Sequence, residues 1–256
     1  MAIHFNNRPG LVAYITCGDP DLDTSRAVAL AAIRAGAEVI ELGVPFSDPV
    51  ADGPVIQRAS ERALKHGTTL GGVLAVARQL REQSQAGLII FSYLNPILQF
   101  GLEKFCAAAA AAGVDGALVT DLPVEEAAEY LKAMKAHKLA PVFLAAPTST
   151  DERLGDVARR SRGFVYAISR TGITGTRQEL AGDARSLVER LRAHTRLPIA
   201  VGFGVSTPEQ FAEVGKFADA AVVGSAIVQR IEASPGREAA AVAEFLTSLT
   251  GAVVSG

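Results

Sequence analysis

The sequence lacks several features that define large classes of protein. Lysine and arginine number 25 against 27 aspartate and glutamate, so the net charge is −2 and no excess of basic charge is available to bind a nucleic-acid backbone. No apolar run approaches the length of a membrane span, and the first residues lack the basic start and apolar segment of a secretory signal. Two cysteines cannot build a disulfide framework. These absences predict a cytoplasmic protein with no nucleic-acid or membrane partner.

Several catalytic signatures are missing as well. The four histidines are scattered and form no zinc-binding spacing, and the chain has no Walker loop and no G-x-S-x-G elbow. Residues 19–23 begin like a calcium loop, but Thr24 and Leu30 stand where such a loop needs glycine and glutamate, so that interpretation is rejected. The lysines fall on expected helices, which disfavours a Schiff-base aldolase. We expect no metal and no cofactor in this chain.

Short runs rich in valine, isoleucine and leucine recur along the chain, with amphipathic segments of helical spacing between them. The runs are 11–18, 38–43, 87–93, 116–121, 140–146, 164–170, 198–204 and 219–225. They are too short for most helices and too continuous for strands with one face in water, which is typical of parallel strands buried on both faces. The alternation predicts an α/β fold, a (β/α)8 TIM barrel, with residues 1–256 as one catalytic domain. An open doubly wound sheet is the alternative, but the turn after the first run reads CGDPD, without a G-x-G-x-x-G pattern.

In a barrel of this kind, function lies at the carboxyl ends of the strands and in the loops that follow them. Glu41 is the first polar residue that stands out there, because it lies inside the apolar run Val39–Gly43. Burial would raise the pKa of its carboxyl group and suit it to proton transfer near neutral pH. A structural glutamate paired with an arginine is an equally open interpretation of the sequence.

Asp52 is the second candidate. It lies in a proline-rich loop that follows the Glu41 strand, and in isolation Asp52-Gly53-Pro54 is most simply a turn or a helix cap. Two carboxylates in one βα unit at the predicted catalytic rim strengthen the acid–base interpretation of both.

Glycines follow the late strands. Gly172 and Gly175 come after the sixth run, Gly204 ends the seventh, and Gly224-Ser225 ends the eighth. Backbone N–H groups at helix starts bind phosphate, and barrels often bind one in the loops after strands seven and eight. Ordinary turn glycines are the alternative, but the two loops together favour a phosphate site.

The motif ELGVPFSDPVADGP, followed by Ile56 and Gln57, resembles the signature of the tryptophan synthase alpha subunit. The resemblance continues through CGDPD, SYLNPI, TDLPVEE, SRTGITG, VGFGVS and VGSAIV, nearly from end to end. It implies a barrel lyase that splits indole-3-glycerol phosphate into indole and glyceraldehyde 3-phosphate. Glu41 then matches the catalytic acid–base, and Asp52 the second catalytic carboxylate, which accepts a hydrogen bond from the indole N–H.

The resemblance also implies the remaining site residues. Those matching the substrate pocket are Tyr14, Ile56, Phe91, Leu118, Tyr166, Thr174 and Phe203. Those matching the phosphate site are Gly175, Gly204, Gly224 and Ser225. Thr174 lies in the sixth loop, which closes over the ligand in this family, and Arg170 stands at the start of that loop.

A partner is implied in the same way. The family's alpha subunit docks on a beta subunit that carries pyridoxal phosphate, within a tetramer of two alpha and two beta chains, and indole passes between the subunits through a tunnel. Residues matching the contact region are Pro45, Phe46, Asp48, Tyr93, Asn95 and Pro123. Loop packing is their alternative interpretation.

The sequence departs from the family pattern at a few positions. Ten residues precede the first expected strand, which indicates a shortened leading helix. Tyr14 stands where the family often has phenylalanine, and Phe91 is bulkier than the usual aliphatic residue. Rival functions are a lyase that works without a partner, a metal-dependent aldolase, and a non-catalytic barrel that binds a ligand and activates a partner. Retention of Glu41 and Asp52 argues against the last of these.

Overall fold

The computed structural model of the protein describes residues 3–168, 177–202 and 204–254. Its strands form one sheet in the order β5-β4-β3-β2-β1-β9-β8-β7-β6, and every neighbouring pair is parallel. The strands are β1 (Gly10–Thr16), β2 (Ala37–Gly43), β3 (Gly87–Ser92), β4 (Gly116–Val119), β5 (Ala140–Val142), β6 (Leu144–Ala145), β7 (Val165–Ile168), β8 (Ile199–Gly202) and β9 (Ala220–Val223).

The sheet closes on itself. Its two outermost strands, β5 and β6, are separated along the chain by Phe143 alone, and the Phe143 carbonyl accepts a hydrogen bond of 3.1 Å from the Tyr166 N–H. β5 and β6 are therefore two halves of one interrupted strand. The eight predicted runs correspond to eight strand positions around a barrel, which confirms the predicted fold class.

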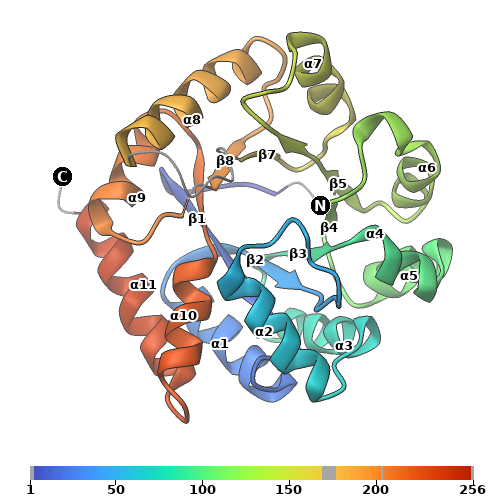
Figure 1. Ribbon diagram of the computed structural model, residues 1–256, viewed down its shortest axis with the longest axis vertical. Helices are drawn as coiled ribbons and strands as arrows, with labels where there is room; N and C mark the ends of the chain where they lie inside the picture. Colours follow the sequence, from blue (N-terminus) through green and yellow to red (C-terminus); the bar gives the residue numbers. More distant parts are fainter. Residues whose placement is uncertain (1–2, 169–176, 203, 255–256) are drawn as a thin grey trace.

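Helices surround the strands as an outer ring (Figure 1). They are α1 (Leu22–Arg34), α2 (Pro54–Lys65), α3 (Leu70–Arg81), α4 (Leu94–Phe100), α5 (Leu102–Ala111), the 3-10 helix η1 (Val124–Glu126), α6 (Ala128–Ala136), α7 (Asp151–Arg160), α8 (Arg177–Arg192), α9 (Pro208–Gly215), α10 (Ser225–Ala233) and α11 (Glu238–Val254). Side chains of Thr69, Thr150 and Thr207 cap α3, α7 and α9, where each accepts a backbone N–H of the first turn.

Alternation along the strands separates two apolar regions. On β2, Ile40 and Leu42 face the helices, whereas Val39 and Glu41 face the barrel interior. Val12 and Ile89, from the strands on either side, join Val39 in the same interior cluster. Side chains fill this interior, so the barrel is a packed core whose inward positions can carry chemistry only near the mouth.

The end of the barrel opposite the mouth, which we call the floor, is also closed. Ile3 is buried in the interior cluster, and Phe5 packs edge-on against Phe164 with ring centroids 6.1 Å apart. The described residues before β1, 3–9, form no helix, so a leading helix is not seen in this part of the chain. A short non-helical segment with two apolar side chains, Ile3 and Phe5, covers the floor.

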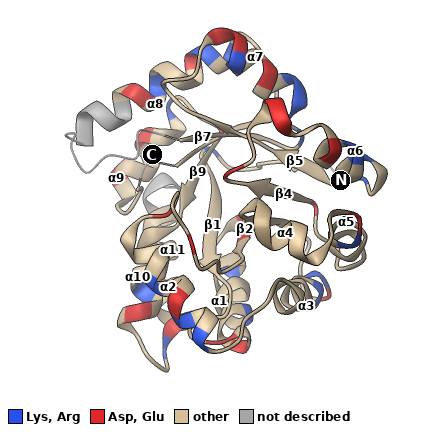
Figure 2. Ribbon diagram, turned by 45° about the vertical axis from the view of Figure 1, so that its right-hand side comes forward, with Lys and Arg blue, Asp and Glu red and all other residues tan. Residues whose placement is uncertain are grey.

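Charged side chains gather on the outer helices, while the strands are almost free of them (Figure 2). Glu41 on β2 therefore stands out as a charged residue type in the wall of an apolar barrel. Within the described ranges, no helix combines the length and apolar character needed to cross a membrane.

Candidate active site at the barrel mouth

Glu41 lies on the inner wall of the barrel, in register with Tyr14 of β1 and Ile89 of β3. It is fully buried, and neither carboxylate oxygen has a hydrogen-bond partner among the residues that the structure describes. Burial raises the pKa of this carboxyl from the usual 4.5 to about 8. No described arginine pairs with it, so the alternative of a structural ion pair has no support here. A carboxyl with this pKa can donate and accept a proton near neutral pH.

Asp52 lies in the loop between β2 and α2, one residue before Gly53, the N-cap of α2. The backbone turns just before the predicted position, over residues 49–52, because the Asp52 N–H donates to the Pro49 carbonyl over 3.0 Å. The side chain does not cap the helix; it accepts a hydrogen bond from the Tyr93 hydroxyl. Burial raises the pKa of Asp52 to about 6, and the Tyr93 hydrogen bond opposes that rise.

Two further contacts hold this loop in place. The Tyr93 hydroxyl accepts the Ala51 N–H over 2.9 Å, and the Gln57 side-chain amide donates to the Asp52 carbonyl over 2.9 Å. The sequence placed Tyr93 among the partner-contact residues only. The hydrogen bond from the Tyr93 hydroxyl to Asp52 is a feature that sequence reasoning missed, because the two residues lie on different βα units and no local pattern links them.

The surroundings of Tyr14 and Tyr166 show how the carboxyl groups of Glu41 and Asp52 lie relative to each other. Burial raises the pKa of both tyrosine hydroxyls, and the negative charges of Asp52 and Glu41 raise each further. Both tyrosines therefore lie within electrostatic reach of both carboxylates. The structure brings Glu41 and Asp52 to one end of the barrel, as the sequence predicted from their position in one βα unit.

Most of the residues matched to the substrate pocket cluster together. Tyr14 packs with Ile56 and Phe91, and the rings of Tyr14 and Phe91 meet edge-to-face at 5.0 Å. Phe91 and Tyr166 both pack against the interior cluster that contains Leu118. Aromatic and aliphatic surface is thus concentrated beside Glu41, which suits it to cover an aromatic ligand. Thr174 and Phe203 lie outside the described residues, as does Arg170.

Two glycines make room for the tyrosines. A Cβ added at Gly43 would lie 2.4 Å from the Tyr14 hydroxyl oxygen, and one at Gly202 would lie 2.7 Å from that of Tyr166. The Tyr14 hydroxyl also lies 3.3 Å from Oγ1 of Thr16. These glycines are required by the close approach of a ring, a role that the sequence did not reveal.

The predicted phosphate residues lie on the same side of the barrel. Gly224 is the N-cap of α10 and Ser225 is its first residue, so the first backbone N–H groups of the helix have no intrahelical acceptor. A Cβ at Gly224 would lie 3.5 Å from Tyr14, which places this helix start beside the aromatic cluster. Gly204 has a φ of 80° and open space above its Cα, as a close-approach glycine requires. Gly175 lies outside the described residues.

The residues matched to partner contact lie in two neighbouring loops. Phe46 stacks at a tilt on Tyr93 with centroids 5.1 Å apart, which joins the loop after β2 to the start of α4. Pro45 is buried, Pro123 is half-buried, and Asp48 and Asn95 are exposed. Two large apolar side chains nearby in the sequence are also exposed, Val50 at 86% and Leu98 at 55%.

Within the described ranges, no group of three or more His, Cys, Asp or Glu residues could hold a metal ion.

The fold and the two carboxyl groups define a (β/α)8-barrel protein with a candidate acid–base site at its mouth. The family model described as tryptophan synthase alpha chain matches residues 1–253. A tryptophan synthase alpha chain of Solibacter usitatus is 55% identical over 244 residues, covering 95% of this chain and 91% of the relative. One of Geobacter sulfurreducens is 49% identical over 252 residues, covering 97% and 94%.

Solved structures agree. A tryptophan synthase structure from Mycobacterium tuberculosis superposes with a TM-score of 0.89 at 38% identity, covering 97% of this chain and 93% of that one. The alpha subunit from Legionella pneumophila gives 0.88 at 36%, covering 97% and 94%. The chain belongs to the tryptophan synthase alpha chain family. It is a carbon–carbon lyase that cleaves indole-3-glycerol phosphate, and the non-catalytic alternative is not supported.

Proposed function

We propose that Glu41 carries the proton transfers of the cleavage and that Asp52 stabilises the charge which the indole ring develops. The observation that carries this proposal is the fully buried Glu41 carboxyl, without a described partner and with a pKa of about 8. An unpaired buried carboxyl costs stability, so its presence calls for a use.

One carboxyl group, that of Glu41, can perform both proton transfers of the cleavage. Protonated Glu41 donates its proton to C3 of the indole, which makes the ring cationic at its N–H. The Asp52 carboxylate accepts a hydrogen bond from that N–H and opposes the charge. The Glu41 carboxylate then removes the proton of the side-chain hydroxyl. The C–C bond breaks as the C=O bond forms, its electrons restore the neutral indole, and Glu41 is again protonated.

Substrate orientation follows from the two ends of the ligand. We assign the phosphate to the N–H groups at the start of α10, around Gly224 and Ser225, with Gly204 and Gly175 alongside. The indole ring then lies against Tyr14, Ile56, Phe91, Leu118 and Tyr166, with Thr174 and Phe203 completing the pocket. Apolar walls exclude water from the cationic ring and strengthen its interaction with Asp52.

The test is the release of indole. Purified chain given indole-3-glycerol phosphate should release indole and glyceraldehyde 3-phosphate in equal amounts. Glu41→Gln should abolish most turnover while retaining affinity for the substrate, because the amide keeps the shape but carries no transferable proton. Unchanged turnover in Glu41→Gln would refute the assignment of Glu41.

The partner belongs to the same proposal. We infer that a beta chain carrying pyridoxal phosphate docks on the loops containing Pro45, Phe46, Asp48, Tyr93, Asn95 and Pro123, and receives indole there. The exposed side chains of Val50 and Leu98 lie close in sequence to these loop residues and would add apolar area to the contact. We further propose an assembly of two alpha and two beta chains in the cytoplasm, no cofactor in this chain, and the whole of 1–256 as one catalytic domain.

Co-expression with a beta chain tests the partner. A stable complex should form, and Val50→Asp and Leu98→Asp should each weaken it without affecting indole release by the isolated chain. If neither substitution changes the affinity of the two chains for each other, the interface lies elsewhere on the surface.

A further inference from the structure

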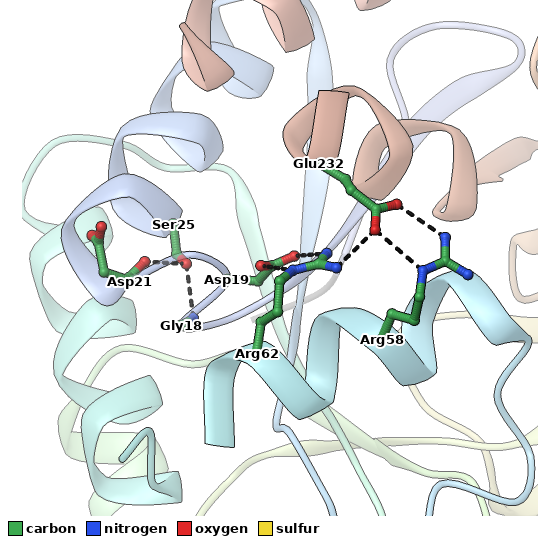
Figure 3. A network of polar contacts seen from close by, with 7 residues as sticks. All are labelled: Gly18, Asp19, Asp21, Ser25, Arg58, Arg62 and Glu232. Atoms are coloured by element: carbon green, nitrogen blue, oxygen red, sulfur yellow. Dashed lines mark hydrogen bonds and ion pairs between the residues drawn. The ribbon is translucent and has the colours of Figure 1, made fainter. Parts of the chain in front are cut away.

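Four charged side chains form a continuous network on the outside of the barrel beside the mouth (Figure 3). Asp19, in the loop after β1, accepts both arms of the Arg62 guanidinium at 2.7 and 2.8 Å. The third nitrogen of Arg62 donates to Glu232 of α10 over 2.8 Å. Glu232 also accepts two hydrogen bonds from Arg58, at 3.1 and 3.0 Å. Arg58 in turn donates to the Pro54 carbonyl over 3.3 Å, at the first residue of α2.

The network joins the two helices that begin at the candidate site. α2 begins two residues after Asp52, and α10 begins at Ser225, next to the phosphate candidate Gly224. Arg58 and Arg62 are four residues apart and lie on one face of α2, the face toward α10. The helices that carry the two proposed anchors for the substrate are therefore tied to each other directly.

An apolar contact joins the same two helices nearer to the start of α10. Ala59 of α2 and Val228 of α10 are both fully buried and pack together with Tyr14. Glu232 lies four residues, or roughly 6 Å along the helix axis, beyond Val228. One contact point would allow the helices to pivot about it, but two separated points also define the angle between them. That angle sets the separation of Asp52 from the start of α10.

The position of Glu232 indicates that the network serves the pair of helices rather than α10 alone. Glu232 lies in the last turn of α10, where a negative charge opposes the helix macrodipole. Asp19 retains only 3% of its side-chain exposure and depends on the Arg62 fork to offset its desolvation. Through Asp19, the helix pair is also anchored to the end of the strand that carries Tyr14.

We propose that Arg62 and Glu232 are positioning residues that hold α2 against α10 at the separation which the two ends of the substrate require. This inference rests on the proposed function, since it takes Asp52 as the indole anchor and the start of α10 as the phosphate anchor. Neither residue touches the substrate. They act on ligands that reach both anchors at once, and not on ligands that use one.

That difference supplies the test. Affinities are measured for indole-3-propanol phosphate, which spans both anchors and cannot be cleaved, and for glycerol 3-phosphate, which reaches the phosphate anchor only. Glu232→Gln removes the charge and presents an NH₂ group to the arginines, so it should weaken the spanning ligand about tenfold. The affinity for glycerol 3-phosphate should change less than twofold. Arg62→Lys should act similarly, because an ammonium group cannot bind Asp19 and Glu232 with the same fork.

Glu213→Gln is the matched control. Glu213 joins α9 to α8 through Arg185 and also pairs with Lys216, so it too binds two cations, and its side-chain exposure is 38% against 34% for Glu232. This variant should affect neither ligand. Arg58→Gln, which cuts only the outer arm of the network, should weaken the spanning ligand less than Glu232→Gln does and gives a second measurement if Arg62→Lys fails to fold.

Two results would overturn the inference. One is an unchanged affinity for the spanning ligand in Glu232→Gln and Arg58→Gln. The other is a parallel loss for both ligands that follows the loss of thermal stability, which would make the network merely structural. Failure of the proposed function is seen separately, because the wild-type chain would then bind neither ligand or release no indole.

Discussion

Asp115 and Asp219 lie at equivalent points of two βα units at the floor of the barrel, whereas Glu41 lies on the inner wall near the mouth. Asp115 comes directly before β4 and accepts the Leu88 N–H at 2.9 Å and an Arg81 nitrogen at 2.7 Å. Asp219 comes directly before β9 and accepts the Ile199 N–H at 2.8 Å and an Arg192 nitrogen. Glu41 is more deeply buried than either and has no described partner.

The carboxyl groups of Asp115 and Asp219 stabilise the fold, whereas the unpaired carboxyl of Glu41 is buried at a cost in stability. At the floor, each carboxylate links its own strand to the preceding strand and binds an arginine, so its desolvation is offset. At the mouth, the Glu41 desolvation is not offset by any described group, and the pKa of the carboxyl rises instead. Substitutions at the two ends should consequently have opposite consequences for stability and activity.

Glu41→Gln should produce the largest effect on activity, a loss of about a thousandfold in turnover, because general acid–base catalysis contributes on that order. Its unfolding free energy should not fall. Folded Glu41 keeps its proton up to a pH of about 8 while the unfolded carboxyl releases it near 4.5, so wild-type stability decreases as pH rises between those values. Urea denaturation across this range should show the variant gaining on the wild type as pH rises. A variant less stable than the wild type at pH 8 would contradict the comparison.

The pH dependence of kcat/KM should be bell-shaped. Glu41 must be protonated to donate and Asp52 must be ionised to accept, so activity should fall below a pH of about 6 and above about 8. The hydroxyls of Tyr14 and Tyr166 also lie near Glu41, but burial raises their pKa values well above the usual 10, so both stay neutral across this range. Asp52→Asn should lower kcat/KM about a hundredfold and remove the acid limb while leaving the alkaline limb. An acid limb that persists in Asp52→Asn would assign it to another group.

Asp115→Ala should show the converse at the floor. It leaves the Leu88 N–H without its acceptor and removes the carboxylate partner of Arg81, which keeps only the Gly113 and Ser84 carbonyls; the loss of a partner from a buried pair costs about 3 kcal/mol. Turnover per folded molecule should stay unchanged, because the floor lies at the far end of the barrel from the mouth. The free energy comes from urea denaturation and the turnover from indole release at a temperature where both proteins are folded. A loss of turnover comparable to that of Asp52→Asn would end the distinction between the two regions.

Much of this arrangement could be predicted from the sequence, for physical reasons that differ between residues. The barrel follows from apolar runs with buried faces on both sides, and Glu41 stands out because a carboxyl group inside such a run is costly. The roles of the pocket residues came from the family resemblance, whereas the phosphate glycines were also indicated by their position after the late strands. The interruption of the strand at Phe143, between β5 and β6, was not predicted, because a run of apolar residues does not indicate where the backbone hydrogen bonds pass from one neighbouring strand to the other.

Contacts between distant side chains were beyond the reach of sequence patterns. The Arg62 side chain binds Asp19, 43 residues away, and Glu232, 170 residues away. Each of these residues on its own is an ordinary charge on a loop or helix surface. Only the closure of the barrel, which places the last βα unit beside the first two, brings them together.

Tyr93→Phe should give the smallest effect and the finest test of the comparison. Its hydroxyl favours the ionised form of Asp52, so removing it should raise the pKa of Asp52 and move the acid limb of kcat/KM upward by about half a pH unit. Tyr130→Phe is the matched control, since its buried hydroxyl donates to the Ala117 carbonyl at 3.0 Å, and its loss should cost about 1 kcal/mol of stability without moving either limb. Both profiles are measured by indole release under identical salt. An acid limb that stays in place in Tyr93→Phe, or moves equally in Tyr130→Phe, would show that the hydrogen bond from Tyr93 does not tune the mouth carboxylate.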